Sequence, residues 1–541
     1  GGGKQQGYFQ ATIDSSVVAF LFIKMSLEET MIKEIKDPEI VIGIVGAVGT
    51  DLKLISRMIE DELKILDYNS QTITLSETLT EFDRYKNLKD IKNDEFKRIE
   101  AFMNAGDDFR EQLSIGAAMA FQGIAAIREY RFQKNGKQDK PISRQAYIFK
   151  SLKRPEEVDH LRKIYGKQFV LFSIYSPQED RLKKLAEDIC RSKSDSDPDK
   201  YISYAEKLIS RDDKSGHKDY GQDVQEAFPL GDFFIKMSAE DDVRSQLKRF
   251  LNIWFGHPFL SPSKDEYGMY FANATAKRSA DLSRQVGAAI MSKEGNVISV
   301  GCNEVPKFSG GIAWDGDNDD YRDFQIGRDQ NVSIKDSIVK ELFTQLKDAG
   351  WLSQEKNARN TVDLMKESLY PKNAPLRGTR LASLLEFGRI VHAEMNALMD
   401  AARRGLSVQG ATLYCTTFPC HMCARHIVSS GIDRVVFIEP YPKSMTEDLY
   451  SDIVSVDERG DGDNKVKFES FMGLSPNVYI RMFERDKRKH DDGYAYTFED
   501  IERYPRVELF RATYLDFEAI VVGEFVKDIK EKFAQMQLFN V

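Results

Sequence analysis

The sequence has few cysteines and no long apolar run. Its five cysteines, Cys190, Cys302, Cys415, Cys420 and Cys423, are too few and too unevenly placed for a disulfide framework. No apolar stretch approaches the roughly 20 residues that a membrane-spanning helix needs, so no membrane partner is expected. Both absences favour a protein of the reducing cytoplasm.

An excess of basic residues is also missing. Lysine and arginine together number 77 against 86 aspartates and glutamates, which gives a formal net charge of −9. Proteins that hold a nucleic-acid backbone usually carry a positive balance, so a polymeric nucleic-acid substrate is disfavoured. A composition of 41% hydrophobic and 30% charged residues indicates a globular chain rather than a disordered one.

The length predicts two domains. We place them at 36–240 and 250–541, expect both to be α/β, and interpret residues 1–30 as a leader or expression remnant. In the first domain, β-branched residues after Pro38 predict a buried strand that leads into a helix over 52–66. Apolar runs at 145–152 and 168–175 flank a helical pattern at 155–165. Such alternation is typical of a parallel sheet.

The second domain shows a different order of elements. We expect a helix over 267–282, strands at 286–291 and 297–302, strands at 411–416 and 434–438, and a helix over 420–430. The largely polar stretch at about 304–385, with one helix near 338–349, interrupts this order. We interpret the stretch as an insertion.

The strongest chemical signal is His392-Ala393-Glu394 followed by Pro419-Cys420-His421-Met422-Cys423. A catalytic zinc ion takes three protein ligands and keeps one open position, and His392, Cys420 and Cys423 supply that set. Glu394 is then free to act as general acid and base. Zinc lowers the pKa of a water ligand to about 7, and Glu394 would pass protons to ring nitrogen N3 and to the leaving ammonia.

Two other readings of these residues remain open. A structural zinc site would recruit His421 or His426 as a fourth ligand, but such a site needs no intervening glutamate. A redox C-x-x-C pair would leave His392 and Glu394 unexplained.

With these motifs, residues 267–441 resemble the deoxycytidylate deaminase branch of the cytidine deaminase superfamily. The shared segments include Arg284-Gln285-Val286-Gly287-Ala288, Gly301-Cys302-Asn303, His392-Ala393-Glu394-Met395-Asn396-Ala397 and Thr416-Thr417-Phe418-Pro419-Cys420. Over its whole length the chain is similar to bacterial antiphage deoxycytidine triphosphate deaminases, which join a P-loop-like domain to this core. Further shared segments are Glu386-Phe387-Gly388-Arg389 and Ile438-Glu439-Pro440-Tyr441.

The resemblance implies an α/β/α deaminase fold with a mixed five-stranded sheet, and one zinc ion per subunit. It implies deamination of dCTP, and of dCMP, in defence against phage. It also implies that Asn303 hydrogen-bonds the sugar and that the protein is a homo-oligomer, with a hexamer as one form, and it makes a small inhibitory RNA a partner to test.

Several residues are weaker candidates for substrate contacts. Arg284 is the preferred phosphate ligand, ahead of Arg389 and Lys443, because it lies beside a shared strand. Tyr441 and Tyr414 are candidate pocket walls, with core packing as the alternative. The acidic run from Asp315 to Asp323 departs from a calcium loop and reads as a solvent loop, although it could close on a Mg²⁺-bound nucleotide.

Gly46, Gly49 and Thr50 lie where a phosphate-binding loop is expected, between a strand and a helix. The segment departs from G-x-x-x-x-G-K-[ST], because Asp51 and Leu52 replace glycine and lysine. We therefore interpret the first domain as a degenerate P-loop kinase-like domain with a nucleotide-binding or structural role. Asp212 and Asp213 read as a solvated charge cluster, with a kinase-like lid as the alternative.

Two functions compete with nucleotide deamination. A polynucleotide cytidine deaminase would need a basic groove interleaved with aromatic residues, which the sequence does not show. A nucleotide- or RNA-sensing regulator could use the deaminase fold as a scaffold, but a dead site would be expected to lose a ligand or Glu394.

Overall fold

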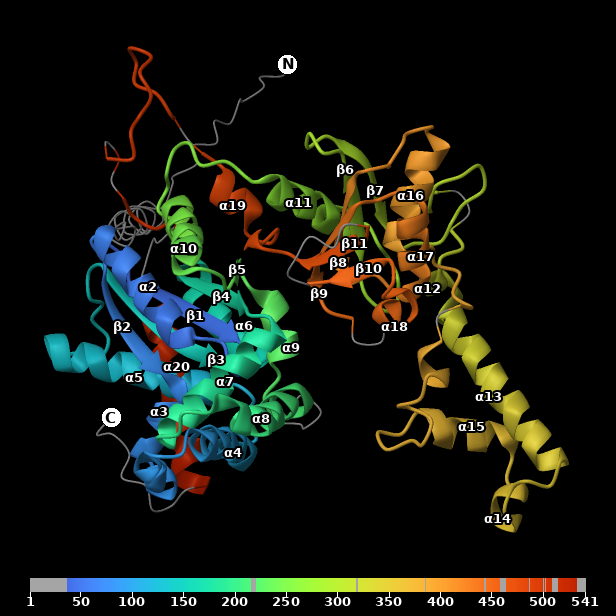
Figure 1. The fold of residues 1–541 in the computed structure, drawn as a ribbon, viewed down its shortest axis with the longest axis horizontal. Helices are drawn as coiled ribbons and strands as arrows, with labels where there is room; N and C mark the ends of the chain where they lie inside the picture. The colour runs from blue at the N-terminus through green and yellow to red at the C-terminus, as the bar shows by residue number, and fades with distance from the viewer. Residues whose placement is uncertain are drawn as a thin grey trace, which may run out of the picture. The chain divides into compact units, whose positions relative to one another are not determined.

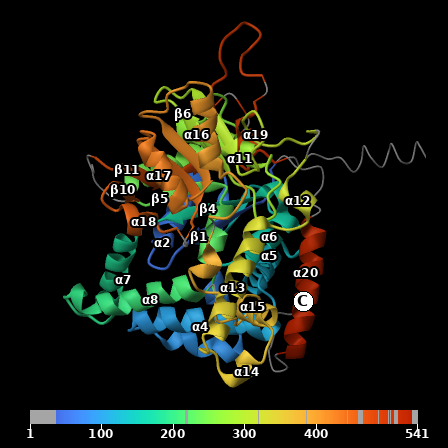
Figure 2. The ribbon, with the colours of Figure 1, turned by 90° about the vertical axis from the view of Figure 1, so that its right-hand side faces the viewer.

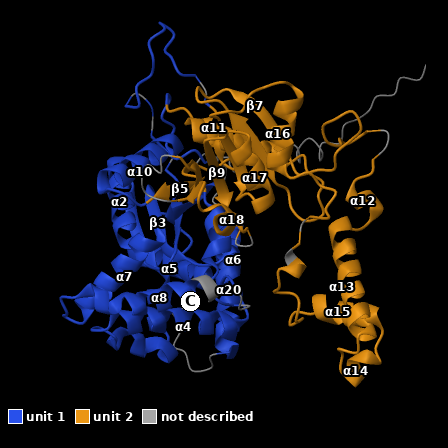
Figure 3. Cartoon of the chain, turned by 45° about the vertical axis from the view of Figure 1, so that its right-hand side comes forward, with its two compact units in different colours: residues 1–231, 237–259, 485–541 blue, residues 232–236, 260–484 orange. Residues whose placement is uncertain are grey.

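The structure is a computed structural model that describes residues 37–215, 220–317, 320–384, 386–441, 444–457, 464–485, 487–499, 501, 503–507 and 514–532. Its internal contacts divide the chain into two compact units (Figure 3). Unit 1 comprises residues 1–231, 237–259 and 485–541, and unit 2 comprises residues 232–236 and 260–484. The leader predicted at 1–30 lies outside the described residues.

Unit 1 is built on a parallel sheet with strand order β4-β1-β3-β2 (Figure 1). The strands are β1 (Ile40–Gly46), β2 (Asn69–Thr74), β3 (Gln145–Leu152) and β4 (Phe169–Tyr175). All seven residues of β1 are buried, as expected for a central strand covered on both faces. The predicted strand, helix and strand at 145–175 are confirmed, with α6 over Pro155–Tyr165.

Helices cover both faces of this sheet. Helices α2 (Leu52–Ile65) and α10 (Glu240–Trp254) pack together on one face, where Phe250 contacts Phe172 of β4 edge to face at 4.8 Å. Helices α5 (Ala118–Asn135), α6 and α20 (Tyr514–Lys532) form the other apolar layer. Helices α4 (Glu95–Leu113), α7 (Gln178–Ser192) and α8 (Ile202–Ser215) gather beside the sheet, as Figure 2 shows.

A buried ion network fixes α20 to this unit. Arg131 of α5 donates to Glu39 at 2.8 and 3.1 Å and to Glu518 of α20, and all three side chains are buried. Tyr514 of α20 donates to Glu39 at 3.0 Å. The single predicted domain over 250–541 differs from this arrangement, because residues 485–541 are assigned to unit 1 and α20 packs into its core.

Unit 2 contains a mixed sheet with strand order β10-β11-β9-β8-β6-β7. Strand β6 is antiparallel to β7 and β8, whereas β8, β9, β11 and β10 run parallel to one another. Their bounds are β6 Gly287–Met291, β7 Val297–Cys302, β8 Thr412–Thr417, β9 Arg434–Glu439, β10 Val454–Val456 and β11 Val466–Ser470. The sheet thus has six strands rather than the expected five, because the three-residue β10 pairs at its edge. Strands β5 (Phe233–Lys236) and β12 (Gly473–Leu474) pair with each other in antiparallel orientation.

The main helices of unit 2 pack closely on the mixed sheet. Helix α11 (Lys264–Ala276) packs on β6, while α16 (Ala393–Arg403) packs on β7 and contacts α17 (His421–Ser429). A side chain at Gly301 of β7 would place its Cβ 2.4 Å from backbone atoms of Ala393 and Ala397. Glycine at this position therefore lets α16 approach the sheet.

Helix α11 ends at Ala276 rather than at the predicted Leu282. The Asp281 side chain accepts a hydrogen bond from the Ser283 backbone at 2.8 Å, which stabilises a turn in place of further helix.

The predicted insertion contains α12 (Asp323–Ile326), α13 (Gln330–Asp348), α14 (Gln354–Asn357) and α15 (Thr361–Leu369). The remaining helices are α3 (Leu75–Thr78), α9 (Val224–Ala227), α18 (Thr446–Tyr450) and α19 (Tyr479–Phe483). Among the described residues, every helix is too short or too polar to span a membrane.

Candidate metal centre

Two helix starts bring the predicted metal ligands together. His392 is the N-cap residue of α16, and Cys420 is the N-cap residue of α17, with Cys423 in the first turn of the same helix. The loop before α17 is held by Ser444, whose hydroxyl donates to the Pro419 carbonyl at 2.9 Å. The positive ends of both helices favour thiolate at these positions.

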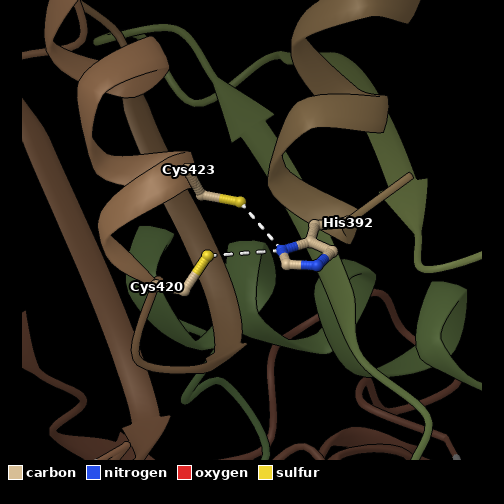
Figure 4. Close-up of side chains that lie close together, drawn as sticks. All are labelled: His392, Cys420 and Cys423. Carbon is tan, nitrogen blue, oxygen red and sulfur yellow. Dashed lines mark hydrogen bonds between the residues drawn. The ribbon is translucent and has the colours of Figure 1, made fainter. Parts of the chain in front are cut away.

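The three donor atoms face one another. The Sγ atoms of Cys420 and Cys423 each lie 3.3 Å from Nδ1 of His392 (Figure 4). All three donor atoms fall within 4.8 Å of one another, and both cysteines are buried. Among the described residues this cluster contains neither His421 nor His426.

The electrostatics of the cluster favour a negative charge on Cys420, whereas the hydrogen bond with Cys420 and burial raise the pKa of Cys423. The hydrogen bond from Cys423 lowers the pKa of Cys420, and His392 lowers it further. The hydrogen bond with Cys420 raises the pKa of His392 to about 9. A bound cation would replace the protons that these groups share, which is how soft divalent metals bind thiolate and imidazole ligands.

Glu394 lies in the first turn of α16 beside this cluster, and its side chain is 4% exposed. Burial raises the pKa of Glu394, and negative charge on Cys420 raises it further. Glu394 is not a member of the donor cluster. A buried carboxyl group with a raised pKa can both accept and donate a proton near neutral pH.

The donor set fits zinc. Two thiolates and one imidazole nitrogen are soft to borderline ligands that zinc accepts in tetrahedral sites. Three such donors leave one coordination position for water or substrate, which is the pattern of catalytic rather than structural zinc.

Asn303, the predicted sugar ligand, is already held by the protein. Its Nδ2 donates to Asp281 at 2.7 Å and to the Arg284 carbonyl at 2.9 Å, and its Oδ1 accepts from the Val286 backbone at 2.7 Å. Both amide hydrogens are used, so one lone pair on Oδ1 is left for a substrate hydroxyl. Asp281, which the sequence did not single out, orients this amide.

Arg284 and Tyr441 lie together. The Arg284 guanidinium carbon is 5.6 Å from the centre of the Tyr441 ring, and Nη1 lies 3.4 Å from a Glu439 oxygen. Tyr441 packs against the apolar cluster that contains Cys420 and Cys423, and burial raises the pKa of its hydroxyl. Glu439 is a second residue that sequence analysis missed.

The other candidate substrate contacts have different surroundings. Tyr414 of β8 is buried, and its hydroxyl donates to Asp265 of α11 at 2.8 Å. Its ring therefore packs in the core between β8 and α11. Arg389 donates to the Tyr321 carbonyl at 2.9 Å and lies 3.3 Å from Asp323. Lys443 lies outside the described residues.

The acidic run is tied to basic partners in the chain. Asp317 pairs with Lys307 at 3.2 Å, and Asp320 pairs with Arg322 at 2.6 Å. Asp315 is exposed, as expected for a solvent loop, whereas Asp323 is buried at the start of α12. Asp319 lies outside the described residues.

The loop between β1 and α2 contains the predicted Gly46, Gly49 and Thr50. Gly49 has a φ of 89°, a left-handed conformation that favours glycine. Asp51 caps α2 by accepting from the Leu54 backbone at 3.0 Å. The Thr50 hydroxyl is buried and makes no hydrogen bond to any described residue.

The reading of Asp212 as a solvated charge is wrong. Its side chain is 5% exposed, and Oδ2 accepts from the Val48 backbone in this same loop at 2.7 Å. The two residues are separated by 164 positions, so their proximity could not be read from local sequence.

A histidine and two cysteines at neighbouring helix starts, with a glutamate that is not a ligand, are the arrangement of the zinc nucleobase deaminases. Residues 262–439 match a family model described as the cytidine and deoxycytidylate deaminase zinc-binding region. The C-terminal part of the chain therefore contains a domain of the cytidine and deoxycytidylate deaminase superfamily.

Two curated relatives with similar segments are named deoxycytidylate deaminases. The enzyme of Enterobacteria phage T2 is 50% identical over 54 residues, which are 10% of this chain and 29% of that protein. The human enzyme is 26% identical over 173 residues, which are 32% of this chain and 63% of that protein. The chain thus spans less than two thirds of either relative.

Among solved structures, one similar chain is the dCMP deaminase of cyanophage S-TIM5 in complex with dCMP and dUMP. It is 17% identical, with a TM-score of 0.22, and the likeness covers 39% of this chain and 100% of that chain.

Proposed function

We propose that this chain hydrolytically deaminates free deoxycytidine nucleotides, converting dCTP to dUTP and dCMP to dUMP. The observation that carries this proposal is the meeting of His392, Cys420 and Cys423 beside the buried Glu394. The deoxycytidylate deaminases that match residues of this domain support the nucleotide substrate class.

His392, Cys420 and Cys423 would hold one zinc ion, which when bound supplies a Lewis acid that lowers the pKa of water. Glu394 takes a proton from the attacking water and delivers it to N3 of cytosine. It then carries a proton to the departing amine. One C4–O bond forms, the C4–N bond breaks, and ammonia leaves.

The substrate would be held by the residues around this centre. Arg284 is the proposed phosphate ligand, and Tyr441 forms a wall beside it. Asn303 would accept a hydrogen bond from a sugar hydroxyl through its remaining lone pair. The pair between Arg284 and Glu439 must loosen for Arg284 to receive a phosphate, and both side chains are partly exposed.

The preference for dCTP and the role in antiphage defence come from the resemblance over the whole chain. Depletion of a DNA precursor would limit phage replication. The homo-oligomer and the small-RNA partner remain predictions of the same resemblance. The cytoplasmic location remains a prediction from the few cysteines and the missing apolar run, and Mg²⁺ bound with the triphosphate remains one from the acidic run.

The direct test is ammonia release by the purified, zinc-loaded chain. We expect turnover of dCTP and dCMP and none of single-stranded DNA. Deamination of single-stranded DNA at a comparable rate would favour a polynucleotide deaminase. Nucleotide binding without turnover would favour a regulator.

A further inference from the structure

Unit 1 contains a cavity of about 810 Å³ that plays no part in the deaminase site. It is lined by the loop after β1 and by residues of α2, α4, α7 and β3. This volume lies within the range of small-molecule sites. All of its lining residues belong to unit 1.

Cationic side chains gather on the cavity wall. Eight basic residues line the cavity, among them Lys53, Arg57, Lys150 and Lys153, against five acidic ones, Asp51, Glu77, Glu95, Glu157 and Asp188. Burial lowers the pKa of Lys150; the charge of Glu77 opposes this shift, and the charges of Lys53 and Arg98 add to it. Among the described residues, no carboxylate lies within ion-pair distance of Lys53, Arg57 or Lys150. This excess of positive charge suits an anionic ligand.

The anion-binding face of the loop holds a carboxylate of the chain itself. Oδ2 of Asp212 accepts from the Val48 backbone at 2.7 Å, and Oδ1 lies 3.7 Å from Nζ of Lys153. Lys153 also donates to the Gly46 carbonyl at 3.1 Å. Backbone N–H groups between a strand and a helix commonly bind phosphate oxygens. Asp212 therefore lies where a phosphate oxygen would be expected to bind, next to Lys153, which follows β3 and takes the place of the missing loop lysine.

A second observation points to a ligand. Gln222 is 6% exposed, lines the cavity, and has an Oε1 atom with no hydrogen-bond partner among the described residues. Nε of the buried Arg110, on the same wall, makes no hydrogen bond to a described residue either. Buried polar atoms are normally paired, and a ligand that carries both donors and anionic groups would pair them.

We propose that this cavity binds a nucleoside polyphosphate, whose phosphates contact the loop at 46–51 and Lys153 and displace the Asp212 carboxylate. Asp212 then acts as a built-in competitor that lowers the affinity for the ligand. The loop still lacks a lysine at Leu52, so the ligand is bound rather than hydrolysed.

The test is titration calorimetry of the full chain with ATP and, separately, with inorganic tripolyphosphate. We expect both to bind, and Asp212→Ala to bind each at least tenfold more tightly. Lys153→Ala and Lys150→Ala should each weaken binding at least tenfold. Gln222→Ala should weaken binding of ATP more than binding of tripolyphosphate, because the latter has no nucleoside donors.

Matched controls lie on the same helices. Glu206→Ala removes an exposed carboxylate from α8, and Lys183→Ala removes an exposed lysine from α7. Both should leave the affinity unchanged. Thermal unfolding of every variant separates a lost site from a lost fold, and Asp212→Ala, whose effect is a gain, cannot be explained by unfolding.

Two results would overturn the proposal. One is the absence of binding at millimolar ATP in both the wild type and Asp212→Ala. The other is binding that Lys153→Ala and Lys150→Ala leave intact. Tripolyphosphate binding with no preference for ATP in any variant would contradict the nucleoside part.

Discussion

Asp265 at the start of α11 receives two parallel hydrogen bonds from Arg434 of β9, at 2.7 and 2.8 Å. The Tyr414 hydroxyl donates to the same carboxylate, and Nε of Arg434 donates to Glu469 of β11 at 2.6 Å. This network joins the helix to three neighbouring strands of unit 2. Paired guanidinium and carboxylate groups are among the stronger polar contacts in proteins.

The first prediction concerns the pH dependence of this pair. Burial alone would raise the pKa of Asp265, but the hydrogen bonds and charge of Arg434 outweigh it and hold the pKa below its usual value. A depressed carboxyl pKa gives stability that is present above the unfolded pKa of about 3.9 and is lost as pH falls through the folded pKa. Asp265→Asn should destabilise unit 2 by about 1–3 kcal/mol at pH 7, and the difference should shrink below about pH 4.

Chemical denaturation at a series of pH values, followed by signals from unit 2, checks this prediction. Asp452→Asn serves as a control, because it removes an exposed carboxylate from the same unit. A loss of stability in Asp265→Asn that is the same at pH 7 and pH 3.5 would contradict it.

The second prediction separates chemistry from metal binding. Glu394→Gln keeps the size of the side chain but cannot carry protons, so the deamination rate should fall by about 10²–10⁴ or more. The zinc content should stay near one ion per chain, because Glu394 is outside the donor cluster. Glu447→Gln on the exposed side of α18 should behave as the wild type. A Glu394→Gln enzyme with full rate would remove Glu394 from the mechanism.

The third prediction concerns the ligands. Cys423→Ser or His392→Ala should abolish stoichiometric zinc, measured by elemental analysis of the purified protein, and activity should be lost with it. Cys190→Ser, in unit 1, should retain both, because the Cys190 thiol donates to the Asp195 carbonyl at 3.1 Å and is not a member of the donor cluster. Full zinc occupancy in Cys423→Ser would show that the metal is held elsewhere.

The fourth prediction tests the close packing under α16. Gly301→Ala would place a methyl group 2.4 Å from backbone atoms of Ala393 and Ala397, so the start of α16 must move. We expect a loss of about 1–3 kcal/mol in stability and a lower deamination rate. Gly523→Ala in α20 meets no atom within 4 Å and should be neutral or slightly stabilising. Unchanged activity in Gly301→Ala would mean that the ligand geometry tolerates this shift.

The fifth prediction concerns the buried network of unit 1. Glu518→Ala leaves Arg131 with Glu39 alone in an apolar interior, and loss of one partner of a buried pair costs about 3–5 kcal/mol. Hydrogen exchange should rise in peptides from α5 and β1. Glu524→Ala on the exposed side of α20 should change little. Unchanged exchange in Glu518→Ala would show that α20 is dispensable for unit 1.

Local sequence patterns predicted most elements near both sites. The β-branched run before Gly46 and the spacing of His392, Cys420 and Cys423 depend on neighbours a few residues away. The structure places β1, α16 and α17 accordingly. The three predicted ligands meet because two helix starts lie side by side.

Contacts between distant segments could not be predicted in this way. The Arg131–Glu518 pair joins positions 387 apart, and the Val48–Asp212 contact joins positions 164 apart. No local periodicity marks either pair. The sixth strand of the unit 2 sheet, β10, has only three residues, too few to show an alternating pattern.

The division of unit 1 into separate stretches of chain has a consequence for its folding during synthesis on the ribosome. Residues 260–484 of unit 2 emerge before Glu518 does. Until then Arg131 has only Glu39 of its two carboxylate partners, and the apolar side of α5 is not yet covered by α20. Unit 2 can therefore finish folding first, whereas unit 1, whose synthesis begins earlier, cannot complete its core until α20 is made.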